Sequence, residues 1–419
     1  MNDFSTPIIP IQQTFIDLEK KKIISWKQNI NKELDYKAIA SFCSLGFMLD
    51  DDTFFKNIKV CKPGKMYVLN SENEIIDKKR IWDWHYQPKQ ESFDNILEEF
   101  TNIFESNISN ATTDKSILLP ISGGLDSRTL LVPICKRKDF TLASYEFDGG
   151  INETYYGKKF AELLNVPFYS EIIQEGYLWN LLHEIAQLNN CFTDFLHPRQ
   201  AAVLNNWNDL GDTILLGHWG DVLFDAQIDS DKYTYDEQIK FLKSKVLKTG
   251  GMELAVDLWN SWGLNGSFNS YITNRIDSLY KSINIDHPSA KIRAFKSLHW
   301  APRWTSVNLS IFSKLGDLVV PYYSDAMCDF ICKVPERFLK GRKIQIAYIK
   351  KHFSEGAVVP WQKYNPLNLY NYQWFYNPVY YPLRAVRKIH RLVKAQISNS
   401  PQYIIRNWEL QLLGDHNIE

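Results

Sequence analysis

This chain of 419 residues lacks several features that would assign it to a particular class of protein. It carries no net charge, because 48 Lys and Arg residues balance 48 Asp and Glu residues. No overall field therefore attracts it to nucleic acid or to an anionic membrane surface. Its apolar runs are all shorter than the ~20 residues that a membrane-spanning helix needs. We expect neither a nucleic-acid partner nor a membrane span.

The cysteines of the sequence also lack the spacing of a metal-binding or redox motif. Its six cysteines form no CxxC pair and no Cys/His ligand set, so a zinc site has little support. Cys328 and Cys332 could share one helix face, but two buried small hydrophobic residues explain that spacing better. The first residues lack the basic and apolar regions of a signal peptide. We expect a reduced, cytoplasmic protein.

Two common nucleotide-binding motifs are missing as well. No Gly-Lys-Ser/Thr follows a glycine-rich loop, which excludes a Walker A motif, and the dinucleotide fingerprint GxGxxG is absent.

The expected secondary structure changes along the chain from short strands, through alternating strands and helices, to helices. Residues 1–90 carry short β-like runs and form a truncated N-terminal β-containing region, 91–365 form the main domain, and 366–419 form a C-terminal helical extension. In the main domain, apolar strands alternate with helical segments, and residues beyond about 230 are mostly helical. This alternation predicts an α/β fold with a doubly wound parallel sheet. The expected strands are 116–121, 141–147 and 213–216, and the expected helices are 128–138 and 153–164.

A glycine-containing loop lies between the first of these strands and the helix that follows. Glycine lets the backbone approach a phosphate closely, and the amides at a helix start attract anions. Two serine hydroxyls add donors, and Asp126 is a suitable ligand for Mg²⁺. The alternative is a turn that only connects a strand to a helix. The loop consists of Ser122, Gly123, Gly124, Leu125, Asp126 and Ser127.

This loop resembles the pyrophosphate loop of the N-type ATP pyrophosphatases, and residues of about 35–365 resemble the synthetase domain of the asparagine synthetase family. Members of that family activate a carboxylate with ATP and pass the acyl group to ammonia or an amine. The segment Gly217–Asp221 matches the family turn S-G-E-G-S-D-E. The resemblance implies an ATP-binding fold similar to the adenine nucleotide alpha hydrolases, in which Mg²⁺ accompanies ATP.

The resemblance also implies roles for individual residues. Leu118, Gly217 and the loop would bind ATP, while Asp126 and Asp221 would hold Mg²⁺. Asp221 could instead serve only as a turn residue. Lys343 matches the lysine that meets the phosphates, although a solvated helix lysine is the competing interpretation and Lys340 and Arg342 lie beside it. Arg303 and Asp325 match family positions near the substrate. Apart from the resemblance, Asp194 and His197, which precede Pro198, are candidates for lining the pocket.

The chain departs from the family pattern in two places. Position 2 is Asn2 rather than the catalytic cysteine of glutamine-dependent members, and about 90 residues precede the synthetase part. We therefore expect no glutamine hydrolysis, and nitrogen would come from free ammonia, a separate amidotransferase or an amine on the substrate. His218 replaces the family glutamate that handles ammonia. Its ordinary pKa near 6.5 suits a general base, with a packing role as the alternative.

The sequence thus predicts an ATP-dependent, amide-forming ligase that acts on a small-molecule, glycan or peptide carboxylate. Two alternatives are another N-type ATP pyrophosphatase, such as a tRNA-modifying enzyme, and a non-catalytic nucleotide-binding scaffold. Neutral charge argues against the first alternative and the intact loop against the second. A basic amphipathic helix is expected at 382–397, either docked on the protein or free to bind a membrane or partner.

Overall fold

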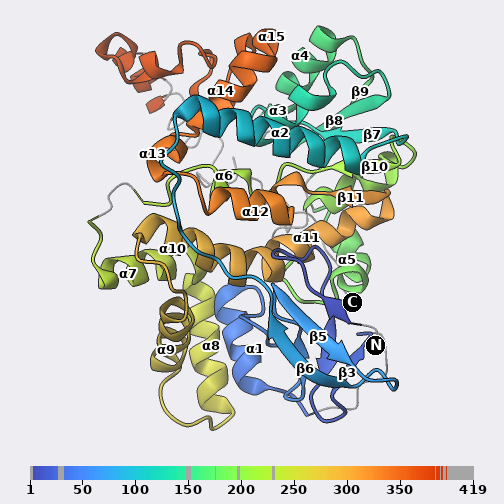
Figure 1. The fold of residues 1–419 in the computed structure, drawn as a ribbon, viewed down its shortest axis with the longest axis vertical. Helices are drawn as coiled ribbons and strands as arrows, with labels where there is room; N and C mark the ends of the chain where they lie inside the picture. The colour runs from blue at the N-terminus through green and yellow to red at the C-terminus, as the bar shows by residue number, and fades with distance from the viewer. Residues whose placement is uncertain are drawn as a thin grey trace.

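A computed structural model describes residues 3–26, 33–147, 152–174, 176–195, 199–228, 232–382, 384–386, 388–389 and 393. The part that carries the parallel sheet lies above the N-terminal β-structure in Figure 1, and a layer of helices separates the two.

The N-terminal region forms two small antiparallel sheets and one helix. Within the described residues the sheets have the strand orders β1-β5-β6 and β3-β2-β4. Asp35 starts the helix by accepting a hydrogen bond from the amide of Ala38, and left-handed Gly46 ends it. The elements are β1 (Phe4–Ser5), β2 (Phe15–Asp17), β3 (Lys22–Ile24), α1 (Tyr36–Leu45), β4 (Ile58–Val60), β5 (Lys65–Leu69) and β6 (Ile75–Arg80).

The main sheet confirms the predicted fold class. It is parallel throughout, with the order β11-β10-β7-β8-β9 among the described strands. Ile117, Leu118 and Leu119 of the central strand are fully buried, which explains the unbroken apolar run. Its elements are α2 (Phe93–Ala111), β7 (Ile117–Pro120), α3 (Leu125–Ile134), β8 (Phe140–Phe147), α4 (Thr154–Leu164), β9 (Phe168–Ile173), β10 (Thr213–Leu215) and β11 (Asp317–Val319).

The strand order reverses between β7 and β10. From β7 the chain builds outward to β8 and β9 on one side, and later strands add β10 and β11 on the other. In open α/β sheets, ligands bind in the crevice at the carboxyl ends of the strands at such a switch point. This crevice lies between the loop after β7, which contains the glycine motif, and the loop after β10.

The described chain beyond about residue 230 is mostly helical, as the sequence predicted. Short connecting elements are η1 (Trp179–Leu181), α5 (Leu182–Asn189), η2 (Arg199–Asn206) and α6 (Gly220–Leu223). The central helical layer and its flanks are α7 (Tyr235–Val246), α8 (Thr249–Ser261), α9 (Phe268–Lys281), α10 (Pro288–Phe295), the π-helix η3 (Lys296–Thr305), α11 (Ser306–Leu309) and η4 (Ser310–Lys314). The last elements are η5 (Pro321–Tyr323), α12 (Asp325–Ile331), α13 (Glu336–Leu339), α14 (Lys343–His352), α15 (Ser354–Val358), η6 (Gln362–Tyr364), η7 (Tyr372–Tyr376) and η8 (Pro378–Tyr380).

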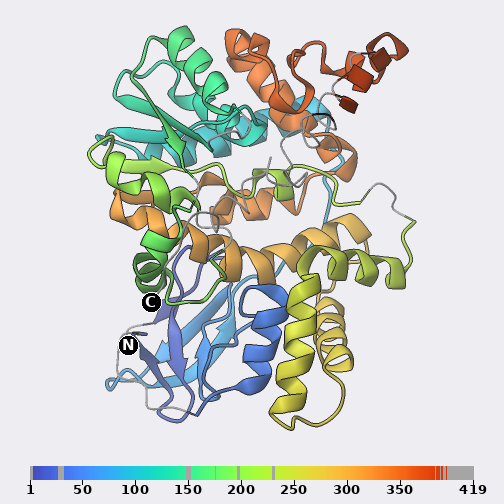
Figure 2. The same cartoon turned by 180° about the vertical axis from the view of Figure 1, so that it is seen from behind.

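Helix α8 packs along α1, and both views show the pair side by side (Figures 1 and 2). Gly251 allows this approach, because a Cβ atom there would collide with the backbone carbonyl of Cys43. The lower part of the molecule therefore combines residues from both sides of the expected boundary at residue 90. The three domain ranges stay a prediction.

Two predictions concern the surface and the C-terminal part. None of the described helices has both the length and the apolar character required to cross a bilayer. The basic helix expected at 382–397 lies largely outside the described residues, which are helical at 384–386 and 388–389.

Candidate functional site

The glycine-containing loop leads directly from β7 into α3. Gly124 occupies the N-cap position, so the first amides of α3 follow at once. Inside the loop, the amide of Ser122 donates to Oγ of Ser127 over 3.1 Å, and the amide of Gly124 donates to Oγ of Ser122 over 3.3 Å. These bonds orient the two hydroxyls along the loop, where hydroxyls and helix amides can bind an anion together.

Glycine is required at position 123 because other segments pack against it. A Cβ atom there would lie 2.6 Å from Cβ of Gln362 and 2.7 Å from the ring of Tyr156. The carbonyl oxygen of Gly123 also accepts a hydrogen bond of 3.1 Å from the amide of Gln362. Residues after α15 therefore lie directly against the glycine-containing loop, a contact that was not predicted from the sequence.

Buried Arg128 fixes this C-terminal segment against α3. Its guanidinium donates to the carbonyl oxygens of Val359 and Pro360 over 2.9 and 2.8 Å and lies 4.9 Å from the centre of the Phe160 ring. Burial lowers the pKa of Arg128 to about 10, which leaves it charged at neutral pH.

The loop after β10 contacts the glycine-containing loop, Ser122–Ser127, through two glycines. A Cβ atom on Gly217 would lie 3.0 Å from backbone atoms of Asp126 and Ser127, and one on Gly220 would overlap the Asp126 carboxylate. Between them, Trp219 adopts a left-handed conformation with φ of 77°. Its indole Nε1 donates to Oγ of Ser297 over 3.1 Å, which fixes the turn. The two loops predicted separately from sequence are therefore in direct contact.

Together the two loops line a cleft of 360 Å³, a size within the ~300–1,000 Å³ typical of small-molecule sites. Among the predicted site residues, the cleft is lined by Ser122, Asp126, Ser127, Gly217, His218 and Asp221. The ends of β7, β8 and β10 contribute further walls, and Glu153 and Gln362 close one side. His218 is half-buried at the edge of this cleft.

Asp126 in the first turn of α3 and Asp221 in the first turn of α6 bring two carboxylates to the same cleft. Burial raises the pKa of Asp126, the nearby Asp221 carboxylate raises it further, and the charge of Arg342 opposes both effects. Mg²⁺ is often held by one or two carboxylates together with substrate phosphates. The pair fits such an ion, although the described residues contain no group of three or more acidic, His or Cys side chains that could hold a metal without substrate.

Arg342, the neighbour of Lys343 in the chain, contacts this site. Its guanidinium forms an ion pair with Asp126, while Gln345 donates to the same carboxylate over 3.1 Å and to the hydroxyl of Tyr322 over 2.7 Å. Lys343 is exposed, does not line the cleft, and donates from Nζ to the carbonyl oxygen of Arg337 over 3.0 Å.

The remaining predicted residues lie elsewhere. Leu118 and Leu125 are buried in the core and do not line the cleft. Arg303 lines a different cavity, and Asp325 accepts a hydrogen bond of 2.9 Å from the amide of Ile8.

Asp194 and His197 were both expected to line the pocket. Asp194 forms an ion pair with Lys248 and does not line the cleft, while His197 lies outside the described residues.

The chain is similar to a few known proteins, and the sequence identity to each of them is low. No family model matches the chain. Asparagine synthetase [glutamine-hydrolyzing] 1 of Bacillus subtilis (strain 168) is 23% identical over 177 residues, which cover 41% of this chain and 27% of that protein. The aligned part thus spans about a quarter of the curated relative. This similarity agrees with the family resemblance inferred from the motifs.

Two solved structures align more loosely. NMN synthetase from Francisella tularensis has 12% identity and a TM-score of 0.25, with coverage of 49% of this chain and 93% of that one. Glutamine-dependent NAD+ synthetase from Acinetobacter baumannii, in complex with adenosine diphosphate, has 11% identity and a TM-score of 0.23, with coverage of 60% and 56%. Superpositions this loose support no conclusion about function.

Proposed function

We propose that this chain is an ATP-dependent ligase that activates a carboxylate as an acyl-adenylate, releases pyrophosphate and transfers the acyl group to ammonia or an amine. One observation carries the proposal: a cleft at the switch point of the sheet is lined both by the glycine-containing loop and by the segment after β10 that carries Asp221. The sequence similarity to asparagine synthetase supports the same reaction class.

In the first step, a carboxylate oxygen attacks the α-phosphorus of ATP, and the bond to the bridging oxygen of pyrophosphate breaks. Negative charge then grows on the departing diphosphate. The amides that open α3 and the hydroxyls of Ser122 and Ser127 would bind this charge, and Arg342 would add a positive charge behind Asp126. Mg²⁺, when held by Asp126 and Asp221, supplies further charge neutralisation.

In the second step, an amine attacks the acyl carbon and AMP leaves. Ammonia reaches the site largely as ammonium, which has no lone pair, so a base at the cleft assists. His218 lines the cleft beside the phosphate loop and is the residue that we assign to this role. The acid could be a small metabolite, a glycan or a peptide, and the nitrogen could come from free ammonia, a separate amidotransferase or the acceptor's own amine.

ATP–pyrophosphate exchange, measured with a panel of carboxylates, tests the proposal directly. We expect at least one acid to support exchange, and Asp126→Asn to lower it by about 10²-fold or more, because the variant loses a metal-binding charge. Asp94→Asn, at an exposed position in the first turn of α2, is the matched control and should exchange normally. Full exchange in Asp126→Asn would contradict the assigned site. ATP binding without exchange for any acid would favour the scaffold alternative.

A further inference from the structure

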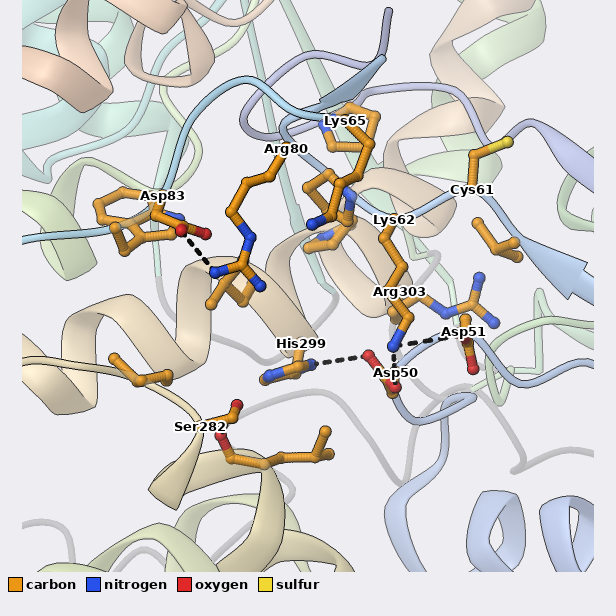
Figure 3. Close-up of a pocket in the computed structure, with 18 of the residues that line it drawn as sticks. Asp50, Asp51, Cys61, Lys62, Lys65, Arg80, Asp83, Ser282, His299 and Arg303 are labelled. Atoms are coloured by element: carbon orange, nitrogen blue, oxygen red, sulfur yellow. Dashed lines mark hydrogen bonds and ion pairs between the residues drawn. The ribbon is translucent and has the colours of Figure 1, made fainter. Parts of the chain in front are cut away.

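A second cavity lies between the N-terminal β-structure and the helical layer. It encloses 190 Å³ and shares no lining residue with the cleft beside the phosphate loop. The lining includes Lys65 at the start of β5, Arg80 at the end of β6, Leu279 of α9, and His299 and Arg303 of η3. In Figure 3, Lys65 and Arg80 lie across the cavity from His299. Segments far apart in the chain therefore enclose this space.

The charged side chains that line this cavity do not balance. Three carboxylates face four basic side chains, and the set consists of Asp50, Asp51, Asp83, Lys62, Lys65, Arg80 and Arg303. Lys62 lies 2.8 Å from Asp50 and 3.3 Å from Asp51, and Arg80 lies 2.6 Å from Asp83. Through these contacts, drawn in Figure 3, each carboxylate of the lining has a cationic neighbour, and Asp50 and Asp51 share Lys62. Lys65 and Arg303 form no ion pair with any of them.

The floor of the cavity holds buried nitrogen atoms that lack acceptors. Arg303 is 2% exposed; its Nε donates to the carbonyl of Met48 over 3.1 Å and its Nη2 to that of Asp52, but Nη1 has no partner. His299 is 7% exposed, with Nδ1 at 3.5 Å from Asp50 and Nε2 without a hydrogen bond. Buried polar atoms are normally satisfied, so this floor indicates a missing partner.

The rest of the lining is apolar. Trp84, Leu279, Ile283 and Leu298 present hydrocarbon surface next to the cationic side chains. Small-molecule sites typically combine such a wall with a few convergent polar groups. In addition, η3 is a π-helix, a rare conformation that occurs often at functional sites.

We propose that this cavity binds a small organic acid, whose carboxylate lies between Lys65 and Arg303 and whose short apolar body packs against Trp84 and Leu279. The carboxylate supplies the acceptor that Nη1 of Arg303 lacks and balances the surplus positive charge. An ammonium ligand is disfavoured, because the lining carboxylates are already paired. This site goes beyond the proposed ligase reaction and does not depend on it.

Saturation-transfer NMR and calorimetry on the full chain test the site with butanoate and benzoate as probes. Butanamide and benzamide, which have the same shape without the charge, and benzylamine serve as ligand controls. We expect at least one acid to bind and the amides and the amine not to bind. Absence of binding by both acids, or equal binding of acid and amide, would overturn the proposal.

Variants then locate the bound acid. Lys65→Met should weaken acid binding about tenfold, since a paired charge is lost, whereas Lys79→Met should leave it unchanged. Lys79 points outward from β6 and pairs only weakly with Asp77 at 3.7 Å, and Lys65 has no ion pair to lose, so both variants should fold. Equal affinity in the two variants would overturn the site. Loss of binding in Asp126→Asn would do the same, because it would place the acid in the other cleft.

Discussion

At the residue scale, Asp126 lies between opposing electrostatic influences. Burial and the Asp221 carboxylate disfavour its charged form, and Arg342 and Gln345 favour it. Burial is the largest of these effects, and a cation bound beside Asp126 would favour its charged form. Neither the sequence motif nor its spacing reveals this balance, because Arg342 and Asp126 are distant in the chain.

Arg342 and Lys343 can be tested against each other, because they are adjacent in the chain but their side chains have different partners. Arg342 contacts Asp126, whereas Lys343 contacts the carbonyl oxygen of Arg337. We expect Arg342→Met to reduce ATP–pyrophosphate exchange by about 10²-fold, because the charge behind the diphosphate is lost. Lys343→Met should change exchange little, as this side chain is exposed and bonds a carbonyl oxygen. The reverse order of the two effects would restore the assignment made from the family pattern.

His218 is tested by separating the two half-reactions. We expect His218→Ala to keep ATP–pyrophosphate exchange and to slow amide formation from ammonia by roughly 10²–10⁴-fold. Hydroxylamine, which is largely unprotonated at neutral pH, should recover product formation because it needs no base. Equal loss of exchange and amide formation, without recovery by hydroxylamine, would assign His218 a packing role.

At the element scale, the site depends on how closely two loops approach. Gly217 and Gly220 allow the loop after β10 to lie against the start of α3. The sequence analysis matched this turn to a family motif without predicting the contact. Strands β9 and β11 were not predicted: β11 has only three residues, too few for a pattern, and both are edge strands with several partly exposed residues.

Gly217→Ala tests the contact between the loops. Its Cβ atom would press on the backbone of Asp126 and Ser127, which cannot rotate away, so we expect a loss of about 1–3 kcal/mol in unfolding free energy. Gly250→Ala, in α8 with no atom within 4 Å of the added carbon, should be neutral or stabilise by up to ~1 kcal/mol. Thermal and denaturant unfolding measure both. A Gly217→Ala protein as stable as the parent would show that the loops separate easily.

At the scale of the whole molecule, a buried ion pair joins α10 to α13. Hydrogen bonds from the same arginine link this pair to the segment after β10. Arg293 in α10 bonds Glu336 in α13, with Nη2 to Oε2 at 3.0 Å, and also donates to the carbonyl oxygens of Val222 and Asp225. Glu336 accepts a further bond of 2.9 Å from Ser289. Removing one partner leaves a buried charge uncompensated.

We expect Glu336→Gln to lower the unfolding free energy at neutral pH by about 3–5 kcal/mol. Burial alone would raise the pKa of Glu336, but the charge and hydrogen bonds of Arg293 prevail and lower it. A depressed carboxyl pKa stabilises the fold above the unfolded value of about 4.3, and this contribution is lost as pH falls through the folded pKa. The difference between parent and variant should therefore shrink below about pH 4.

Glu162→Gln is the control for this prediction. Glu162 forms an exposed pair with Lys159 at 3.7 Å, which should contribute at most ~1 kcal/mol. Denaturant unfolding at several pH values compares the two variants. A pH-independent difference for Glu336→Gln would mean that packing, rather than the ion pair, is responsible.

The sequence by itself determined three of the five strands of the parallel sheet and the place of the glycine-containing loop. An apolar run buried on both faces and a short glycine-containing turn are local features, and local features are readable from residue order. This is why the parallel α/β fold and the order of strand, loop and helix around residues 122–127 were predicted, although α3 spans Leu125–Ile134 rather than the expected 128–138.

Only the tertiary structure decided which distant side chains meet. Arg342 rather than Lys343 contacts Asp126, Gln362 packs on Gly123, and Arg303 joins a second cavity with Lys65. These outcomes depend on strand order and on the direction in which each helix presents a side chain. Both are set by packing between segments far apart in the chain, so no pattern along the sequence contains them.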